Sequence, residues 1–341
     1  MLVLAMRKIK RMFLAGLVAV AVATGCGVPA GVVLLPTPTL GATTGPPTVV
    51  LLPASLTPTA VDPTAEPTLL TPSAVPATVT VTPAPSLPTA TETATRVPSP
   101  TVGPTPDAEA LLRQAPLPIL MYHYVEPWPP GPDELRQGLT VRPDDFAAQL
   151  AYLHAEGYVT VSLYDLVDAL AVGRPLPEKA VVITFDDGYR SLMDYAVPMM
   201  QPYGYTGAVF VITQLMDEDF PQYLTWAQAE SLYAQGWMIE PHTKTHEQLA
   251  GRGREFQLYQ MLGSLQTVEA HIGRTPRFFA YPSGEYDDLS VQIARELRLW
   301  GAVTTQYGLV HTLGSLYTLA RVRVSGTGTL DEFRAALGEY P

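Results

Sequence analysis

One stretch of this 341-residue chain, residues 28–118, lacks the side chains that build a hydrophobic core. It contains 20 of the chain's 34 prolines and 19 threonines, and it has no tryptophan, tyrosine or phenylalanine. Such a composition cannot offset the entropy that is lost when a chain becomes ordered. Only residues 119–341, which hold all 4 tryptophans and all 17 tyrosines, can form a compact domain, and this length suits a single one.

The N-terminal residues have the pattern of an export signal. Four basic residues precede an apolar run of 12 residues, 12–23, which is shorter than the about 20 residues that a membrane-spanning helix needs. The following Ala23-Thr24-Gly25-Cys26 resembles a bacterial lipobox, whose cysteine is lipidated and becomes the mature N-terminus. We therefore predict a lipoprotein-type signal peptide over residues 1–25 and lipidation of Cys26. The alternative is an ordinary secretory signal followed by an unrelated cysteine.

This organisation predicts a domain held at the outer face of the bacterial cell membrane by its lipid. Residues 26–118 are expected to be a disordered, lipid-anchored Pro/Thr-rich linker, and residues 119–341 to be the catalytic domain. A single cysteine excludes an intramolecular disulfide and a cysteine-based metal cluster. After residue 118 the chain has 15 basic and 27 acidic residues, a balance of −12, which argues against nucleic acid as a partner. The oligomeric state is left open.

From residue 119 onward, short apolar runs alternate with amphipathic segments. Ala180 to Phe185 has the composition of a buried strand, and residues 163–172 have a helical pattern behind the capping box Ser162-Leu163-Tyr164-Asp165. Seven or eight such alternations predict an α/β fold with a parallel sheet, and we favour an irregular (β/α) barrel over an open, doubly wound sheet. No G-x-G-x-x-G motif follows a predicted strand, which argues against a dinucleotide site.

Polar residues follow three of the predicted strands, at the end where a parallel barrel has its active face. They are Asp186-Asp187-Gly188, the run from Pro241 to His246, and Pro282-Ser283-Gly284. Alone, Asp-Asp-Gly is typical of a turn, and two histidines four residues apart are a weak signal. Together they predict a metal site of two histidines and one carboxylate, formed by Asp187, His242 and His246, with zinc as the first candidate. Asp186 is then free to activate a water molecule as a base.

Two other hydrolytic reactions fit these residues less well. Thr243 stands where the H-E-x-x-H motif of metallopeptidases has its glutamate. Glycosidases need two carboxylates about 5 to 9.5 Å apart on opposite sides of the scissile bond. Adjacent aspartates at the end of an extended strand point in different directions and suit two different roles. Hydrolysis of an acyl group is therefore the favoured reaction.

These motifs resemble those of the polysaccharide deacetylase family, the NodB-homology domain of carbohydrate esterase family four. Thr184-Phe185-Asp186-Asp187-Gly188 matches the first motif of the family, and His242-Thr243-Lys244-Thr245-His246 matches the second, H-[ST]-x-x-H. The resemblance covers nearly all of residues 119–341. It implies a distorted (β/α) barrel and Asp186 as the general base. It also implies that Asp187, His242 and His246 bind zinc or another divalent metal.

The third motif has a less common form. Ala280-Tyr281-Pro282-Ser283-Gly284 resembles the F-A-Y-P-x-G version found in the branch that acts on exported poly-N-acetylglucosamine. Ala280 stands where an arginine usually orients the base, and Arg277 and Arg321 are the candidates to replace it. The backbone N–H of Ser283 is expected to donate a hydrogen bond to the oxyanion, since that role needs no particular side chain.

The late L-x-H motif, whose histidine is the usual general acid, is absent from the corresponding region, residues 319–324. In the poly-N-acetylglucosamine branch the acid resembles a histidine in an early M-Y-H motif, which Met121-Tyr122-His123 matches. His123 is therefore the first candidate for the acid, and His311 is the second. His154 and His271 fall on predicted helices and are expected to be surface or packing residues.

The resemblance implies an N-acetylated polysaccharide of N-acetylglucosamine as substrate and acetate as product. Four residues near predicted strand ends are candidates to contact the sugar: Tyr281, Pro282, Tyr122 and Trp226. The alternative substrates are peptidoglycan, chitin oligomers and acetylxylan. A catalytically idle surface domain that binds glycan remains the alternative of another class.

Overall fold

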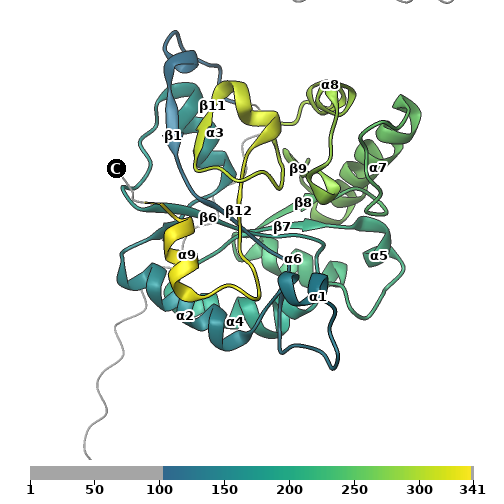
Figure 1. Ribbon diagram of the computed structural model, residues 1–341. Helices are drawn as coiled ribbons and strands as arrows, with labels where there is room; N and C mark the ends of the chain where they lie inside the picture. Colours follow the sequence, from purple (N-terminus) through teal and green to yellow (C-terminus); the bar gives the residue numbers. More distant parts are fainter. Residues whose placement is uncertain (1–102, 339–341) are drawn as a thin grey trace, which may run out of the picture. The chain divides into compact units, whose positions relative to one another are not determined.

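The structure, a computed structural model, describes residues 103–338; the predicted signal peptide, Cys26 and the predicted linker before residue 103 lie outside these residues (Figure 1). The strands of the described part are β1 (Gln114–Pro116), β2 (Ile119–Tyr122), β3 (Tyr124–Val125), β4 (Thr140–Val141), β5 (Val159–Thr160), β6 (Ala180–Phe185), β7 (Ala208–Val211), β8 (Met238–Pro241), β9 (Phe278–Ala280), β10 (Gly301–Val303), β11 (Val310–Thr312) and β12 (Val322–Arg323). The α-helices are α1 (Glu134–Leu139), α2 (Pro143–Ala155), α3 (Leu163–Val172), α4 (Val197–Met200), α5 (Thr213–Asp217), α6 (Trp226–Ala234), α7 (Arg254–Ile272), α8 (Asp288–Glu296) and α9 (Leu330–Ala336). None of these helices combines the length and the apolar character that crossing a bilayer requires.

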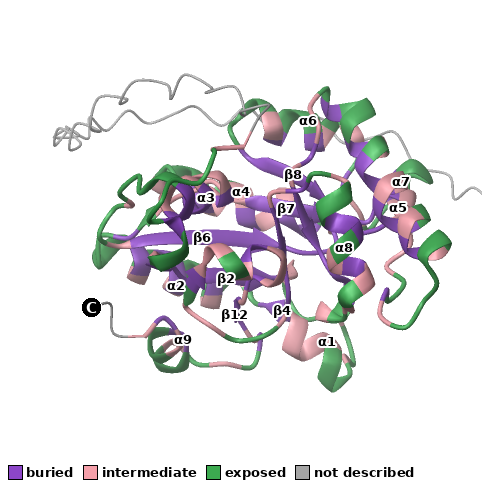
Figure 2. Cartoon of the chain, turned by 90° about the horizontal axis from the view of Figure 1, so that it is seen from above, coloured by how far each residue is buried: buried purple, intermediate pink, exposed green. Residues whose placement is uncertain are grey.

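A parallel sheet with the strand order β12-β2-β6-β7-β8 forms the centre, and β5 pairs with β6 beside it. The helices surround these strands, which are almost wholly buried, and the exposed residues lie on the outer sides of the helices (Figure 2). β9 and β10 form a second parallel pair. The predicted α/β class with a parallel sheet is therefore confirmed.

The strand pairing does not close a barrel within residues 103–338, because no ladder joins β8 to β9. Two side chains bridge this seam instead. The Glu240 carboxylate accepts hydrogen bonds from the N–H groups of Arg277 (2.9 Å) and Phe278 (3.0 Å), and His242 Nδ1 donates to the Ala280 carbonyl oxygen (2.7 Å). A parallel sheet and a parallel pair thus meet at a seam held by side chains, which is consistent with the predicted irregular (β/α) barrel, although the strand pairing of the described residues does not close it.

Alternate residues of β6 face opposite sides of the sheet. Ile183 and Phe185 belong to the hydrophobic cluster that includes side chains of α2, α4, α6 and α9. Val182 belongs to a second cluster, on the other side, with Phe278 of β9. Because side chains alternate along a strand, Asp186 points to the same inner side as Val182.

Residues 103–118, which were expected to be linker, are part of the folded unit. β1 pairs antiparallel with β11, and Ala110 and Leu117 are only 1% and 0% exposed. Arg113 pairs with Asp107 and donates hydrogen bonds to the last carbonyl groups of α3, where a cation is favoured by the helix dipole. The domain boundary therefore lies before residue 119, because this segment contributes apolar side chains and pairs with β11.

Candidate active site

Asp187, His242 and His246 meet at one point, with ligand atoms that all lie within 4.8 Å of one another. Asp187 Oδ1 is 3.4 Å from His242 Nε2 and 3.3 Å from His246 Nε2. A tetrahedron with metal–ligand bonds of 2.0 to 2.1 Å has edges of about 3.4 Å. In the described structure Asp187 Oδ1 is buried and accepts no hydrogen bond. A buried carboxylate oxygen without a donor, facing two imidazole nitrogens, fits the ligand set of a divalent cation.

The environment of His242 prepares it to bind a metal. A carbonyl oxygen can only accept a hydrogen bond, so the contact with Ala280 assigns the proton to Nδ1 and leaves the lone pair of Nε2 facing Asp187. Burial lowers the pKa of His242, which favours the neutral imidazole. The side chain of His246 is 38% exposed, so the third ligand leaves the site open to solvent on its side.

The backbone of the site is strained. Asp187, Thr243, His246 and Ser283 have φ angles of 69°, 66°, 62° and 57°, a region that residues other than glycine seldom adopt. They are four of the six such residues in residues 103–338. Thr243 Oγ1 accepts a hydrogen bond from the His246 N–H (2.9 Å) and holds the second motif in this conformation. Strain of this kind gathers at functional sites, where the surrounding structure enforces it.

A buried arginine holds Asp186. Arg321 Nη1 and Nη2 donate to the two carboxylate oxygens at 2.7 and 2.6 Å, and the two side chains are 0% and 3% exposed. Arg321 also donates to Thr184 Oγ1 (3.0 Å) and to the Thr304 carbonyl oxygen (2.8 Å). Burial acts to raise the pKa of Asp186, but the charge and hydrogen bonds of Arg321 outweigh it and hold the pKa well below its ordinary value. Asp186 is therefore an ionised carboxylate in a fixed orientation.

Arg321 thus orients Asp186, the role that the family's usual arginine at the position of Ala280 would have. Arg277, the other candidate, lies over the Trp300 ring and donates to the Arg298 carbonyl oxygen. A sequence signal for Arg321 existed in the alternation Arg321-Val322-Arg323-Val324. Val322 and Val324 pack in the cluster on the helix side of the sheet, so residue 321 must face the inner side together with Asp186.

His123 lies beside Asp186 at the ends of two neighbouring strands. Tyr122 pairs with Phe185 in register, and the Asp186 N–H donates to the Tyr122 carbonyl oxygen (2.9 Å). His123 and Asp186, the residues that follow this pair, therefore lie side by side at the ends of the two strands. Burial lowers the pKa of His123 to about 4, although the charge of Asp186 opposes this. The imidazole is therefore neutral at neutral pH.

His311, the second candidate for the acid, is fully buried in the β1–β11 pair. Its Nε2 donates to the Leu117 carbonyl oxygen (2.9 Å), and burial lowers its pKa. This histidine ties the residue that follows β1 to β11 and lies outside the cluster of metal-ligand candidates. As expected, His154 on α2 and His271 on α7 are packing residues: His154 lies against Tyr203, and His271 stacks on Trp226 of α6.

Ser283 lies in a tight turn, Pro282–Gly284, directly after β9. Its N–H makes no hydrogen bond within the described residues, and its side chain is exposed. Gly284 has a φ of 75°, and a Cβ there would lie 2.2 Å from Thr305 Oγ1, so the turn requires glycine. The turn thus presents a free backbone donor, which the predicted oxyanion role of Ser283 needs.

The four residues predicted to contact the sugar differ in their burial and in their contacts. Tyr122 is 1% exposed and its hydroxyl donates to Gln149, so it packs in the core on the helix side of the sheet. Tyr281 is 0% exposed, and Pro282 is also buried. Trp226 stacks on His271 of α7. The structure corrects the assignments of Tyr122 and Tyr281, because strand alternation turns both rings away from the inner side.

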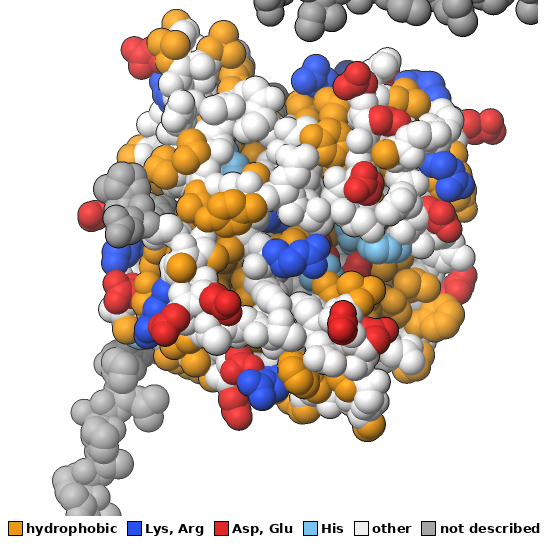
Figure 3. All heavy atoms as spheres, in the orientation of Figure 1, with side chains coloured by type: hydrophobic (Ala, Val, Ile, Leu, Met, Phe, Trp, Pro, Cys, Tyr) orange, Lys and Arg blue, Asp and Glu red, His pale blue; other side chains and the backbone are white. Residues whose placement is uncertain are grey.

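Three tyrosines that the sequence analysis did not single out flank Asp187. The rings of Tyr124 and Tyr189 are 3.6 Å apart, and those of Tyr189 and Tyr223 are 5.1 Å apart. Burial, together with the nearby charge of Asp187, raises the pKa of Tyr124 to about 12. Tyr124 and Tyr189 directly follow the predicted site residues in the chain, which was the available signal. On this face of the molecule histidine side chains reach the surface next to acidic and basic ones (Figure 3).

Comparison with known proteins agrees with this arrangement. The sequence profile of the family described as polysaccharide deacetylase matches residues 173–301. The Bacillus subtilis protein YxkH, whose name assigns it to the polysaccharide deacetylases, is 30% identical over 213 residues, which cover 62% of this chain and 73% of YxkH. The poly-β-1,6-N-acetyl-D-glucosamine N-deacetylase of Escherichia coli K12 is 24% identical over 279 aligned residues, which cover 67% of this chain and only 40% of that protein.

Among solved structures, the deacetylase PplD of Streptococcus pyogenes in complex with acetate is similar with a TM-score of 0.62 and 28% sequence identity. The similarity covers 66% of this chain and 99% of PplD. The sequence matches, the similar fold and the geometry of the site therefore all agree with the two motifs at residues 184–188 and 242–246. The chain belongs to the polysaccharide deacetylase family, whose members hydrolyse the N-acetyl amide bonds of polysaccharides.

Proposed function

We propose that this protein is a metal-dependent N-deacetylase that releases acetate from a cell-surface polysaccharide of N-acetylglucosamine. The observation that carries the proposal is the pair of Asp186 and Arg321 directly beside the cluster of Asp187, His242 and His246. A domain that only bound glycan or metal would have no use for a second, ionised and buried carboxylate next to the ligands. Hydrolysis needs such a group as the base.

The residues of the site have separate roles in the proposed reaction. Asp187, His242 and His246 would hold the divalent cation, with zinc as the first candidate; such a cation polarises the acetyl carbonyl and lowers the pKa of water. Asp186 accepts the proton of the attacking water, because each of its oxygens keeps a lone pair beyond the one that Arg321 uses. The Ser283 N–H stabilises the oxygen that gains negative charge.

His123 is assigned the delivery of a proton to the departing amine. Its imidazole is neutral before the reaction, since burial lowers its pKa to about 4. The proton that it delivers must therefore be gained during the reaction, and the closest source is the proton that Asp186 takes from water. One proton leaves water and one proton reaches the amine, so the products are acetate and a glucosamine unit.

Two features support poly-N-acetylglucosamine as the substrate. The chain has the early M-Y-H motif at residues 121–123 and the F-A-Y-P-x-G motif at residues 279–284. A curated relative is named for deacetylation of poly-β-1,6-N-acetyl-D-glucosamine. The lipobox at Cys26 and the Pro/Thr-rich stretch after it support a position at the outer face of the cell membrane, where such a polymer is exported.

Acetate release by the full-length, zinc-loaded protein tests the proposal. The substrates are oligomers of β-1,6-linked N-acetylglucosamine, chitin oligomers, acetylxylan and peptidoglycan fragments. We expect the β-1,6-linked oligomers to give the highest kcat/KM. The Asp186→Asn variant, which keeps the shape of the side chain, should be at least about 100-fold slower. Absence of acetate release from all four substrates, or equal rates for the variant and the wild type, would refute the assignment.

A further inference from the structure

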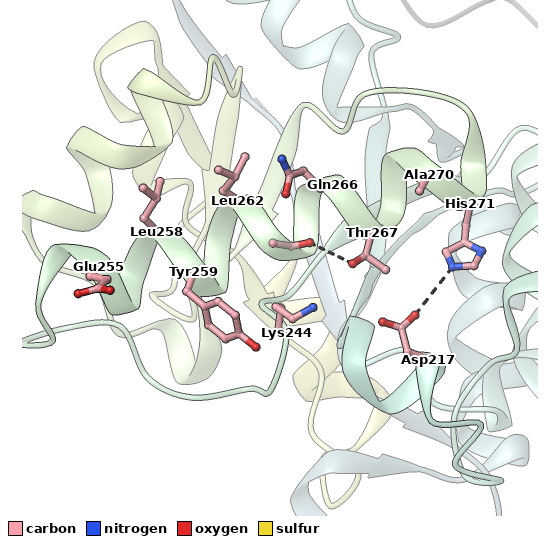
Figure 4. A pocket seen from close by; sticks show the side chains of 11 residues that line it. Asp217, Lys244, Glu255, Leu258, Tyr259, Leu262, Gln266, Thr267, Ala270 and His271 are labelled. Atoms are coloured by element: carbon pink, nitrogen blue, oxygen red, sulfur yellow. Dashed lines mark hydrogen bonds and ion pairs between the residues drawn. The ribbon is translucent and has the colours of Figure 1, made fainter.

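A groove of about 760 Å³ lies outside the reaction centre, between α5, α7 and the loop that carries the histidine motif (Figure 4). The polar and aromatic residues that line it include Asp217, Lys244, Tyr259, Gln266, Thr267 and His271. Most of its length follows α7 from Glu255 to His271, which at the helical rise is about 24 Å. This length is several times that of one sugar ring.

The loop that carries the histidine motif reaches the groove at the middle of α7 (Figure 4). Lys244 lies between the two histidine ligands in the chain, and its side chain extends across α7 at Gly263. A Cβ at residue 263 would lie 2.7 Å from Lys244 Cδ, so glycine is what allows this close approach. Gln260 of α7 accepts hydrogen bonds from the backbone N–H groups of Lys244 (3.0 Å) and Thr245 (3.2 Å). The histidine loop and α7 are thus held together at the middle of the groove.

The chemistry of the groove suits a neutral sugar chain. Tyr259 is 57% exposed and offers an aromatic surface to the apolar face of a sugar. Lys244 and Gln266 supply donors, while Asp217 and Glu255 supply acceptors. Charges of both signs are mixed along the groove, which fits a polymer rich in hydroxyl and amide groups better than a polyanion.

At the His271 end of the groove, three side chains are held together by a hydrogen bond, a close contact and ring stacking. Trp226 Nε1 donates to Asp217 Oδ1 (2.9 Å), and His271 Nε2 lies 3.8 Å from the same oxygen. The rings of Trp226 and His271 stack with their centroids 4.1 Å apart and their planes 4° apart. A preformed arrangement of this kind loses little conformational entropy when a ligand binds.

We propose that the groove along α7 binds the part of the polysaccharide that extends beyond the unit being deacetylated. The inference rests on the proposed function and adds to it a preference for long chains. A polymer held at the metal site has to leave it in some direction, and the groove offers a path that is lined at its middle by Lys244, a residue of the histidine motif. Contacts in the groove therefore strengthen the binding of a long chain and do not change the reaction of the acetyl group.

Kinetics on short and long substrates test the groove. In the full-length protein, Tyr259→Ala and Gln266→Ala should each raise KM for a long β-1,6-linked oligomer, by about tenfold for Tyr259→Ala, with kcat unchanged. Neither variant should change kcat or KM for the disaccharide, which is too short to reach the groove. Glu269→Ala is the control, since it removes an exposed side chain of the same helix that does not line the groove.

Calorimetry separates binding from turnover. Asp186→Asn protein should bind the long oligomer, and the double variant with Tyr259→Ala should bind it about tenfold more weakly. If the wild type releases no acetate, the proposed function fails, while these binding measurements still test the groove. The groove proposal is overturned if both groove variants match the control on long oligomers. It is equally overturned if they slow the disaccharide as much as the long chain.

Discussion

Replacing Arg321 with methionine should destabilise the protein and disable the proposed base at the same time. The Arg321 side chain is 0% exposed and donates to both oxygens of Asp186, to Thr184 Oγ1 and to the Thr304 carbonyl oxygen. Methionine fills a similar volume without any donor. Three buried acceptor groups therefore lose their partner, and the charge of Asp186 is left uncompensated.

The size of the effect follows from that uncompensated charge. Removing one partner of a buried ion pair costs about 3 to 5 kcal/mol of unfolding free energy. In the wild type the pKa of Asp186 is depressed, so its contribution to stability is complete above the ordinary carboxyl pKa and is lost as pH falls through the folded-state value. In the variant, burial raises the pKa of Asp186, because the main opposing influence, the charge and hydrogen bonds of Arg321, is gone. The deficit relative to wild type should therefore shrink as pH falls towards about 4.

Urea unfolding of the metal-free, full-length protein, followed by tryptophan fluorescence at several pH values, measures the difference in unfolding free energy between Arg321→Met and the wild type. Arg321→Lys is the matched variant: it keeps the charge but cannot bond both oxygens of Asp186 in parallel, so we expect an intermediate loss. In zinc-loaded protein, kcat/KM should follow the same order. Unfolding free energies of Arg321→Met within about 0.5 kcal/mol of wild type at neutral pH, or an unchanged kcat/KM, would refute the role given to the pair.

Three further predictions concern the seam, a helix cap and the metal ligands. Glu240→Gln replaces one of the two carboxyl oxygens between β8 and β9 with an amide NH2 group, which cannot accept hydrogen bonds, so hydrogen exchange should become faster at residues 277–280 and change little in β6. Asp287 accepts hydrogen bonds from backbone N–H groups that outweigh its partial burial and lower its pKa to about 2. Asp287→Asn should therefore cost about 1 kcal/mol above pH 4, after allowance for its partial exposure, and only a small part of this near pH 2. His246→Ala removes one ligand atom, so zinc should raise the Tm of the wild type, but not of the variant, and a chelator should reverse the rise.

Each of these has an outcome that contradicts it. Exchange at residues 277–280 that is unchanged in Glu240→Gln would mean that backbone contacts alone hold the seam. A stability difference for Asp287→Asn that is as large at pH 2 as above pH 4 would point to lost packing and not to charge. Zinc stabilisation of His246→Ala equal to that of the wild type would place the cation elsewhere. His271→Ala, a histidine outside the cluster, is the control for that measurement.

Local patterns predicted the parts of the site that lie close together in the chain. The apolar run 180–185 predicted a buried strand, and Asp186 and Asp187 follow it at the end where parallel strands present their functional residues. The capping box at Ser162 predicted the start of α3. These features depend on a few neighbouring residues, because strand propensity, capping and turn formation are short-range effects.

The residues that complete the site were decided by contacts between distant parts of the chain. Arg321 lies 135 residues from Asp186, and the choice between it and Arg277 depends on which side of β12 faces inward. The direction of Tyr122 was decided in the same way: an aromatic residue near a strand end suggested a sugar contact, but strand alternation turns its ring into the core.

The sequence by itself thus determined the family, the chemistry of the ligands and the parallel α/β class, since motifs and periodicity are local. Tertiary structure decided the partner of the base, the seam between β8 and β9 and the start of the folded unit before residue 119. It also brought α5 and α7 together to form the groove. Register, side-chain direction and helix packing are set by the whole core, which no short window of the sequence contains.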